Sequence, residues 1–208
     1  MNRCLGMLAG LAITYAGATS ASAATFVFNA ALTGDAERPA VTTPGTGISV
    51  VTFDDVAKLL TIQASFSGLL GNTTASHIHC CTPPTGNAGV ATTVPTLTSF
   101  PLGVTSGSFS QTLDLNLASS FNPAFVTASG GTLAGARDRL VGGLFANQTY
   151  LNIHTSRFPG GEIRGNLVAA VPEPATWGMM ILGFGAIGYS LRSSRLRTST
   201  SSRLIAGG

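Results

Sequence analysis

The chain has 208 residues, of which 44% are hydrophobic and only 9% are charged. Soluble domains usually carry about 25% charged residues, so this composition excludes a typical cytosolic enzyme surface, and the apolar content excludes a disordered chain. The net charge of +3 does not indicate nucleic-acid binding, because the excess of arginine lies at the two ends of the chain. These arginines are Arg3, Arg192, Arg195, Arg197 and Arg203.

Residues 1–23 have the three parts of a secretory signal peptide. Arg3 supplies the positive charge, residues 5–18 form a short apolar run, and Ala21-Ser22-Ala23 is a small-residue cleavage site. The run is diluted with Ala and Gly, and no stop-transfer charges follow it, which argues against a membrane anchor. We therefore expect the export machinery and signal peptidase to produce a mature chain that begins at Ala24.

Residues 24–170 form the predicted domain, in which apolar residues mainly recur at every second position. Leu60, Ile62 and Phe66 alternate with polar residues, as in a strand with one face on a core. Similar short patterns occur at 26–32, 48–53, 60–66, 75–80, 107–113, 150–154 and 162–168. Seven short strands predict an all-β domain, either an immunoglobulin-like β-sandwich or a barrel.

Two segments of the domain follow other patterns. Residues 83–101 are rich in Thr, Pro and Gly, with little periodicity, and predict a long surface loop. After Thr132, a candidate N-cap, apolar residues recur at helical spacing from Leu133 to Leu144. This pattern predicts one short inserted helix that ends near Asn147.

The histidines form a candidate metal site. His77 and His79 flank Ile78 in a predicted strand, so both imidazoles project from the same face. His154 ends another predicted strand, and these three are the whole histidine complement of the chain. If they converge, they suit Zn(II) or Cu(II); the alternative is three hydrogen-bonded structural histidines.

Cys80 and Cys81 follow directly and are the only cysteines after residue 23. In an oxidising compartment they form a vicinal disulfide, pair between chains or stay as thiols. Adjacent Cα atoms lie about 3.8 Å apart, less than the roughly 4.4 Å of ordinary disulfides, so a vicinal bridge needs a turn. Cys80 is a weaker candidate for a fourth metal ligand, because its side chain lies on the same face of the strand as Ile78, opposite to the two histidines.

Pro159-Gly160-Gly161 predicts a turn that brings the strand ending at His154 back beside the strand starting at Glu162. Glu162 and Arg164 then share one strand face, and we expect an ion pair between them to close the hairpin. The alternative is a carboxylate that orients His154 or acts as a general base. The sequence contains no nucleophile elbow, phosphate-binding loop or paired-carboxylate pattern.

Five segments of the domain carry recognisable motifs. They are Ala-Leu-Thr-Gly-Asp-Ala-Glu-Arg-Pro-Ala-Val (31–41), Val-Thr-Phe-Asp (51–54), Phe-Ser-Gly-Leu (66–69), Ala-Ser-His-Ile-His (75–79) and Tyr-Leu-Asn-Ile-His-Thr-Ser-Arg-Phe-Pro-Gly-Gly-Glu-Ile-Arg-Gly (150–165). In this order they are similar to the CHRD domain of chordin-type extracellular proteins. The resemblance implies a secreted β-rich domain and does not imply an enzyme. Cys80-Cys81 replaces the Gly that often follows His-x-His in the family.

The C-terminal segment has a second pattern. Pro172-Glu173-Pro174 precedes an uncharged run at 175–191, which includes Trp-Gly-Met-Met-Ile-Leu-Gly-Phe-Gly, and a basic end at 192–197. As a helix the run would measure about 25 Å, at the lower limit for crossing a hydrocarbon core of roughly 30 Å. The positive-inside rule places the basic end and residues 198–208 in the cytoplasm and the domain outside.

This order of motif, apolar span and basic end, over residues 171–197, resembles the PEP-CTERM sorting signal of Gram-negative bacteria. The resemblance implies recognition by an exosortase, a membrane-embedded cysteine transpeptidase that processes the chain near Pro-Glu-Pro. Until then the C-terminal helix would anchor the protein in the inner membrane.

Together these features predict a non-enzymatic, secreted or cell-surface protein without a required cofactor. We expect a binding or structural role in the cell envelope or the extracellular matrix, with exopolysaccharide as a candidate partner. The alternative is an extracytoplasmic Cu- or Zn-binding or redox protein that uses His77, His79 and His154. The additional ligands of copper/zinc superoxide dismutase are absent, so dismutase activity is not expected.

Overall fold

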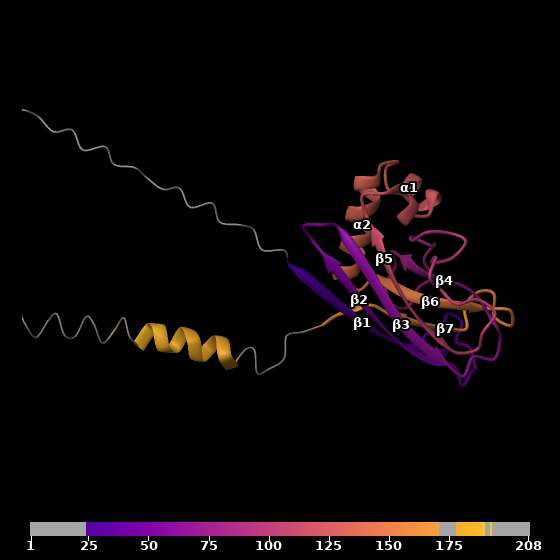
Figure 1. The fold of residues 1–208 in the computed structure, drawn as a ribbon, viewed down its shortest axis with the longest axis horizontal. Coiled ribbons are helices and arrows are strands. Elements are labelled where there is room, and N and C mark those ends of the chain that lie inside the picture. The colour runs from indigo at the N-terminus through magenta and orange to yellow at the C-terminus, as the bar shows by residue number, and fades with distance from the viewer. Residues whose placement is uncertain (1–23, 171–177, 190–191, 193–208) are drawn as a thin grey trace, which may run out of the picture.

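The structure is a computed structural model that describes residues 24–170, 178–189 and 192 (Figure 1). Its β-strands are β1 (Thr25–Thr33), β2 (Thr46–Asp54), β3 (Leu59–Ser67), β4 (Thr73–Cys80), β5 (Gly107–Asp114), β6 (Thr149–Thr155), β7 (Ile163–Asn166) and β8 (Val168–Ala169). Every predicted strand is present, and the last of them is divided into β7 and β8. The prediction of a mainly β domain is therefore confirmed.

The strands form one antiparallel sheet in the order β4-β6-β7-β1-β2-β3-β5, with β8 paired to β1. β1 and β7 pair only at Thr33 and Arg164. The sheet curls there, and Figure 1 shows β6 and β7 crossing the direction of β1, β2 and β3.

An immunoglobulin-like sandwich or a barrel is not confirmed by this pairing. In the described part of the chain, the hydrogen bonds connect all the strands into one sheet, and its edge strands β4 and β5 do not pair with each other. The sequence pattern does not distinguish these arrangements, because alternation shows which face of a strand is buried but not which strands pair.

The hydrophobic core lies inside the curl of the sheet. Phe28 and Leu32 of β1, Ile62 of β3, Ile78 of β4 and Ile153 of β6 are fully buried in it. Burial of each such side chain contributes roughly 1.5–3 kcal/mol to stability. The core therefore holds β4, β6 and β7 against β1, β2, β3 and β5, although β7 and β1 share few hydrogen bonds.

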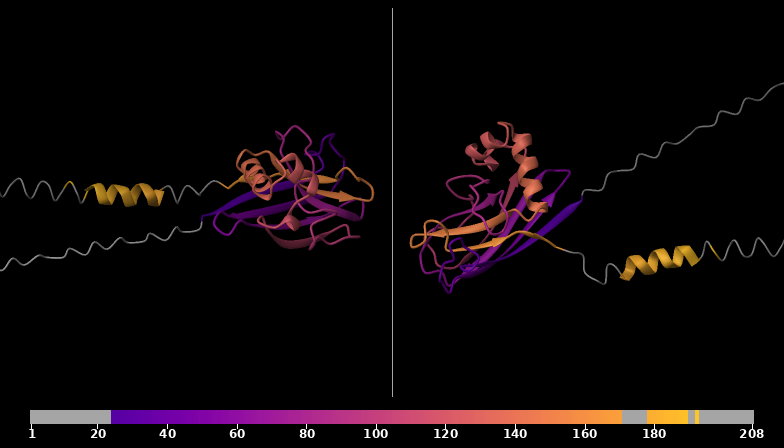
Figure 2. Two further views of the ribbon diagram at one scale, coloured as in Figure 1. Left: turned by 90° about the horizontal axis from the view of Figure 1, so that it is seen from above. Right: turned by 180° about the vertical axis from the view of Figure 1, so that it is seen from behind.

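Three short helices connect β5 to β6 (Figure 2): η1 (Ala118–Ser120), α1 (Pro123–Ala128) and α2 (Leu133–Phe145). The hydroxyl of Thr132 accepts a hydrogen bond from the N–H of Gly135 at 3.0 Å, so the predicted N-cap is confirmed. α2 ends two residues before the predicted Asn147. α1 has only six residues, too few to show a helical period, and the sequence pattern does not predict it.

The predicted loop at 83–101 contains no helix or strand in the structure, and it packs against β4. Ala91 donates a backbone hydrogen bond to Ile78 at 2.9 Å, and Leu97 donates one to Ser76 at 3.1 Å. β4 therefore has β6 on one side and the loop on the other. As a result, the second half of β4 is buried on both faces.

Residues 178–189 are helical and lie within the predicted membrane span at 175–191. Among the residues that the structure describes, none of the helices is both long and apolar enough to cross a bilayer. The predicted signal peptide at 1–23, the motif Pro172-Glu173-Pro174 and residues 193–208 lie outside the described residues.

Candidate metal centre

β4 and β6 place the three histidines on one face of the sheet. His77 and His79 lie two residues apart on β4, on the face opposite Ile78. In the antiparallel register, His77 is opposite Asn152 and His79 is opposite Tyr150 on β6, and His154 follows two residues after Asn152. The predicted convergence of the three side chains is therefore present.

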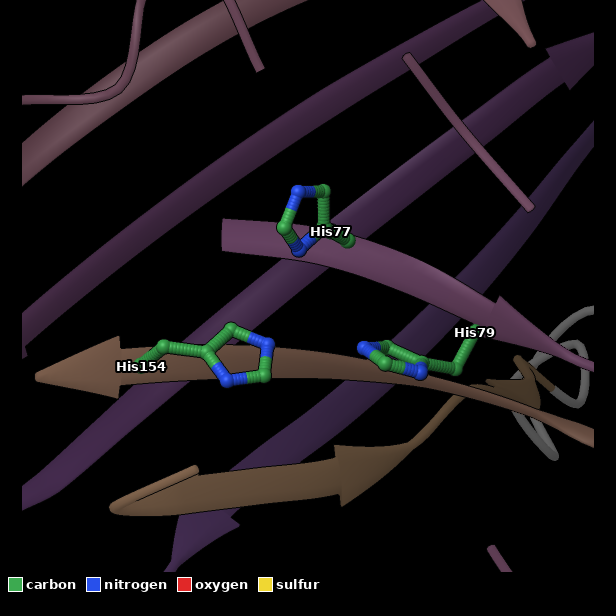
Figure 3. Close-up of side chains that lie close together, drawn as sticks. All are labelled: His77, His79 and His154. Carbon is green, nitrogen blue, oxygen red and sulfur yellow. The ribbon is translucent and has the colours of Figure 1, made fainter. Parts of the chain in front are cut away.

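The imidazole rings are close enough to bind one ion. The centroid of the His77 ring lies 6.0 Å from that of His79 and 5.4 Å from that of His154, and the His79 and His154 centroids are 5.7 Å apart. One nitrogen from each ring lies within 4.8 Å of the others. Figure 3 shows the rings of His79 and His154 directed toward each other along β6, with His77 beside them.

Each imidazole is oriented by a main-chain carbonyl. His77 Nε2 lies 2.8 Å from the oxygen of Pro95, His79 Nδ1 lies 2.9 Å from that of Ala88, and His154 Nδ1 lies 2.9 Å from that of Pro159. A carbonyl oxygen only accepts, so these ring nitrogens carry the proton. Backbone carbonyls orient metal-binding histidines in the same way.

The second nitrogen of each ring therefore carries a lone pair. These atoms are Nδ1 of His77, Nε2 of His79 and Nε2 of His154, and all three are buried without a hydrogen-bond partner. Three buried acceptors that face one another without a donor are an arrangement that a metal ion satisfies.

Burial lowers the pKa of all three imidazoles, and it is the largest influence on each. The hydrogen bonds to the carbonyl oxygens act in the opposite direction but do not cancel it. The pKa of His79 falls to about 4, with smaller contributions from the other two histidines and from Arg164. At neutral pH the rings are uncharged, which is the form that metal ions bind.

Tyr150 and Arg164 extend the site along β6 and β7. The Tyr150 ring stacks on His79 with centroids 4.8 Å apart, and the Arg164 guanidinium lies 4.5 Å from the centre of the Tyr150 ring. Sequence reasoning did not single out Tyr150, although its position two residues before Asn152 places it on the histidine face. Arg164 is 1% exposed, so its charge is held inside the domain.

Comparisons with known proteins match two parts of the chain. A model of the CHRD domain matches residues 28–167. The chain belongs to the CHRD domain family. A model of the PEP-CTERM protein-sorting motif matches residues 170–195, which implies processing by an exosortase and an envelope or extracellular location. No curated protein and no solved structure matches the chain.

Within the CHRD domain, the predicted ion pair between Glu162 and Arg164 is wrong. Arg164 Nε lies 3.9 Å from Oε2 of Glu37, which the sequence analysis did not single out. Burial raises the pKa of Glu37 to about 7, against the opposing effect of the charges of Arg164 and Arg38. The partner of Arg164 therefore comes from the β1–β2 connection and not from its own hairpin.

Glu162 instead holds three loops of the CHRD domain together, just after the predicted turn at 159–161. Its Oε1 accepts hydrogen bonds from Thr43 and from Leu70 N–H, each at 2.6 Å. Its Oε2 accepts from Thr155 at 2.7 Å and from Gly71 N–H at 3.1 Å. Burial alone would raise the pKa of Glu162, but these four bonds together hold it below its usual value.

The turn that precedes Glu162 is confirmed. β6 and β7 pair antiparallel, with Ile153 opposite Ile163, and Gly161 has a φ of 127°. A side chain there would be strained, and its Cβ would lie 2.5 Å from Oδ1 of Asn152. Gly161 therefore allows the turn to pack against the polar face of β6.

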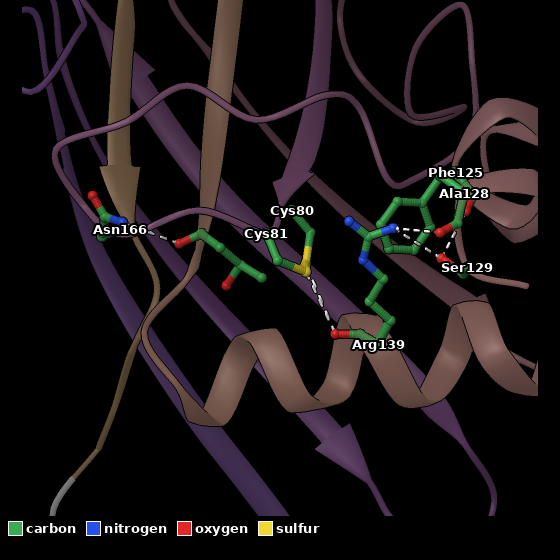
Figure 4. The surroundings of a disulfide bond; sticks show 8 residues. Cys80, Cys81, Phe125, Ala128, Ser129, Arg139 and Asn166 are labelled. Atoms are coloured by element: carbon green, nitrogen blue, oxygen red, sulfur yellow. Dashed lines mark hydrogen bonds between the residues drawn. A yellow bond between two sulfur atoms is a disulfide. The ribbon is translucent and has the colours of Figure 1, made fainter.

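Cys80 and Cys81 are joined by a disulfide bond, one of the three forms that the sequence left open. Figure 4 shows the bond beside α2, and the sulfur atoms lie 3.8 and 3.5 Å from the carbonyl oxygen of Arg139. Cys80 is 4% exposed and belongs to the hydrophobic core, on the face of β4 away from the histidines. Its sulfur is therefore not directed at the candidate metal centre.

We expect Gly143→Ala and Gly142→Ala to have opposite effects on stability. A Cβ at Gly143 would lie 2.6 Å from Sγ of Cys80 and 2.9 Å from Sγ of Cys81, whereas Gly142 faces open space. Overpacking in Gly143→Ala should lower the free energy of unfolding by about 1–3 kcal/mol, and Gly142→Ala should raise it by up to about 1 kcal/mol. Urea denaturation measures both, and equal stability of the two variants would contradict this packing.

Glu162→Gln should destabilise the domain in a pH-dependent way. The amide NH2 replaces an oxygen that accepts two hydrogen bonds, and each buried donor left unpaired costs about 1–3 kcal/mol. Because the folded-state pKa of Glu162 lies below the ordinary 4.5, its contribution is present above about pH 4.5 and is lost as pH falls through the folded-state pKa.

The difference between wild type and Glu162→Gln in urea denaturation should therefore be largest at pH 6–7 and shrink below pH 4.5. The exposed Asp35→Asn variant is the control and should stay within about 0.5 kcal/mol of wild type. A difference that is constant from pH 7 to pH 3 would show that the charge of Glu162 is not what the four donors recognise.

Proposed function

We propose that this protein is an exported CHRD-domain protein that binds one Cu(II) or Zn(II) ion through His77, His79 and His154. Its role in the cell envelope or extracellular matrix is binding or structural, and it catalyses no reaction. Two observations support it: one nitrogen of each ring lies within 4.8 Å of the others, and each ring has one buried nitrogen without a hydrogen-bond partner.

The energetics of burial favour an ion over three purely structural histidines. A buried acceptor without a partner costs about 1–3 kcal/mol, and here three such atoms face the same point. Structural histidines in a strand pair would be expected to use both ring nitrogens. Each ring instead uses one nitrogen on a carbonyl and directs the other toward the remaining two rings.

The donor set also fits the proposed metals. Imidazole is a good ligand for Zn and Cu, and Zn–N bonds of about 2.0–2.1 Å place tetrahedral ligand nitrogens about 3.3 Å apart. The three nitrogens lie within 4.8 Å, so closure on an ion needs shifts of about 1 Å or less at each ring. Shifts of that size are available to side chains held by loops.

The processing route supports an extracytoplasmic site. We propose that signal peptidase removes residues 1–23, that residues 175–191 anchor the chain transiently in the inner membrane, and that an exosortase processes it near Pro172-Glu173-Pro174. The PEP-CTERM motif at 170–195 supports the last step. Exopolysaccharide of the matrix is the proposed neighbour of the released domain.

Metal analysis of the native exported protein tests the proposed site. We expect about one Cu or Zn per chain after purification or after addition of either ion, and His77→Ala, His79→Ala and His154→Ala should each lose it. At a free ion concentration 100 times Kd, binding should raise the free energy of unfolding by about 2.7 kcal/mol in wild type but not in the three histidine variants.

The matched control is Ser76→Ala, which lies on β4 but on the opposite face from the histidines. Ser76 is fully buried and bonds to the carbonyl of Asn152 at 2.9 Å, so this variant disturbs the same strands and should keep the metal. The proposal fails if the folded wild-type protein takes up neither ion in stoichiometric amount.

The sorting step has its own test. Replacing Pro172-Glu173-Pro174 by Ala-Ala-Ala should leave an unprocessed, heavier chain in the membrane fraction, because the exosortase no longer recognises it. Intact mass and cell fractionation measure this outcome, and wild type should begin at Ala24 and lack the basic end. Identical mature masses for the two chains would contradict exosortase processing.

A further inference from the structure

The proposed metal centre has one ligand fewer than a closed structural site. Structural zinc sites usually have four protein ligands, whereas sites with three leave a position for water or another small molecule. His77, His79 and His154 are the only His, Cys, Asp or Glu residues that gather there in the described part of the chain. A fourth protein ligand would have to come from another side chain nearby.

The neighbouring sulfur and carboxylate groups lie outside the histidine cluster. Cys80 is in a disulfide and faces the core side of β4. Both oxygens of Glu162 accept hydrogen bonds, two at each oxygen. Glu37 has Oε2 3.9 Å from Arg164, and its Oε1 is buried next to Gly161 without a hydrogen-bond partner, but the residue is not part of the histidine cluster. None of these groups joins the histidine cluster.

The phenol of Tyr150 is also engaged. Its hydroxyl accepts from the N–H of Ala88 at 3.1 Å and donates to the carbonyl of Ala88 at 3.2 Å. The ring lies parallel to His79, with an interplanar angle of 9°. In this geometry Tyr150 packs on one face of the His79 ring, and its hydroxyl stays bonded to the main chain of the loop at 83–101.

The electrostatics of the site favour an anion at the remaining position. The three ligands are neutral, and the groups that orient them are neutral carbonyls. Beyond Tyr150, the buried guanidinium of Arg164 lies on the side of His79. Burial raises the pKa of its partner Glu37 to about 7, so this carboxyl offsets only part of the positive charge at neutral pH. A divalent ion here would have no negative ligand from the protein, and a small anion would supply it.

The exposed fractions of the three histidines indicate from which side a small molecule can reach the ion. His77 and His79 are 6% and 7% exposed, whereas His154, at the end of β6, is only half-buried. The turn that carries Pro159 follows directly after His154 and is the nearest cover on that side. A small ligand therefore reaches the ion past His154 more readily than across β4.

We infer that the metal ion bound by His77, His79 and His154 keeps an open coordination position that takes a small inorganic anion. This inference rests on the proposed metal site and names the class of ligand that the site takes. The anion binds as an added ligand that displaces water, and no bond within the protein is made or broken.

Azide titration of the copper-loaded protein tests this inference. The full processed chain is loaded with Cu(II), and excess copper is removed by gel filtration. We expect azide to produce a new ligand-to-copper charge-transfer band that saturates at one azide per copper, with a matching change in the EPR spectrum. Ser76→Ala, on the opposite face of β4, should give the same titration.

The outcomes separate the two proposals. Stoichiometric copper with no spectral change at a large excess of azide would overturn the open position while leaving the three-histidine site intact. A folded wild-type protein that retains no copper would overturn the metal site itself, and the anion site with it. His77→Ala, passed through the same gel filtration, should show neither copper nor the azide band.

Discussion

The face of β4 and β6 that carries the three histidines is both polar and buried, and this combination determines the chemistry of the domain. In β3, as in most of the sheet, one face meets the core and the other meets water. On β4 and β6, the loop at 83–101 and the turn after His154 cover the second face. Polar side chains there lose water and need internal partners, which the covering main chain provides. The loops that close the site are thus also the loops that orient it.

Buried charged groups also need internal partners, which explains why Glu162 and Arg164 of the last hairpin do not pair with each other. Glu162 collects donors from the segments around Thr43, Leu70 and Thr155, while Arg164 donates to Ala36 and to Asn87. Most of these partners lie in loops that are distant in sequence, and only Thr155 belongs to the same hairpin. Arg164 thereby connects the hairpin to the loop whose Ala88 orients His79, whereas Glu162 connects it to the β1–β2 and β3–β4 connections.

Period-two alternation was enough to predict the strands and the common face of His77 and His79, because both depend only on local geometry. The convergence with His154 depends on the register between β4 and β6, which tertiary packing determines. The carbonyls that orient the imidazoles lie in segments without any periodic pattern, and Glu37 lies far from Arg164 in sequence. The sequence therefore predicted the ligands of the candidate site, whereas their orienting groups required the structure.

The candidate metal site is preorganised, because contacts on both faces of β4 hold the end of this strand in place. On the polar face His79 lies between Tyr150 and the carbonyl of Ala88, and on the core face Cys80 is tied to Cys81 against α2. With β4 fixed in this way, the rings are already near their bound positions, and little ordering remains when an ion binds. Closure on an ion still needs small shifts at each ring, and His154, the most exposed ligand, whose orienting carbonyl belongs to a turn, is the ring with the most freedom to move. The strands thus supply the rigid part of the site and the turn supplies its adjustable part.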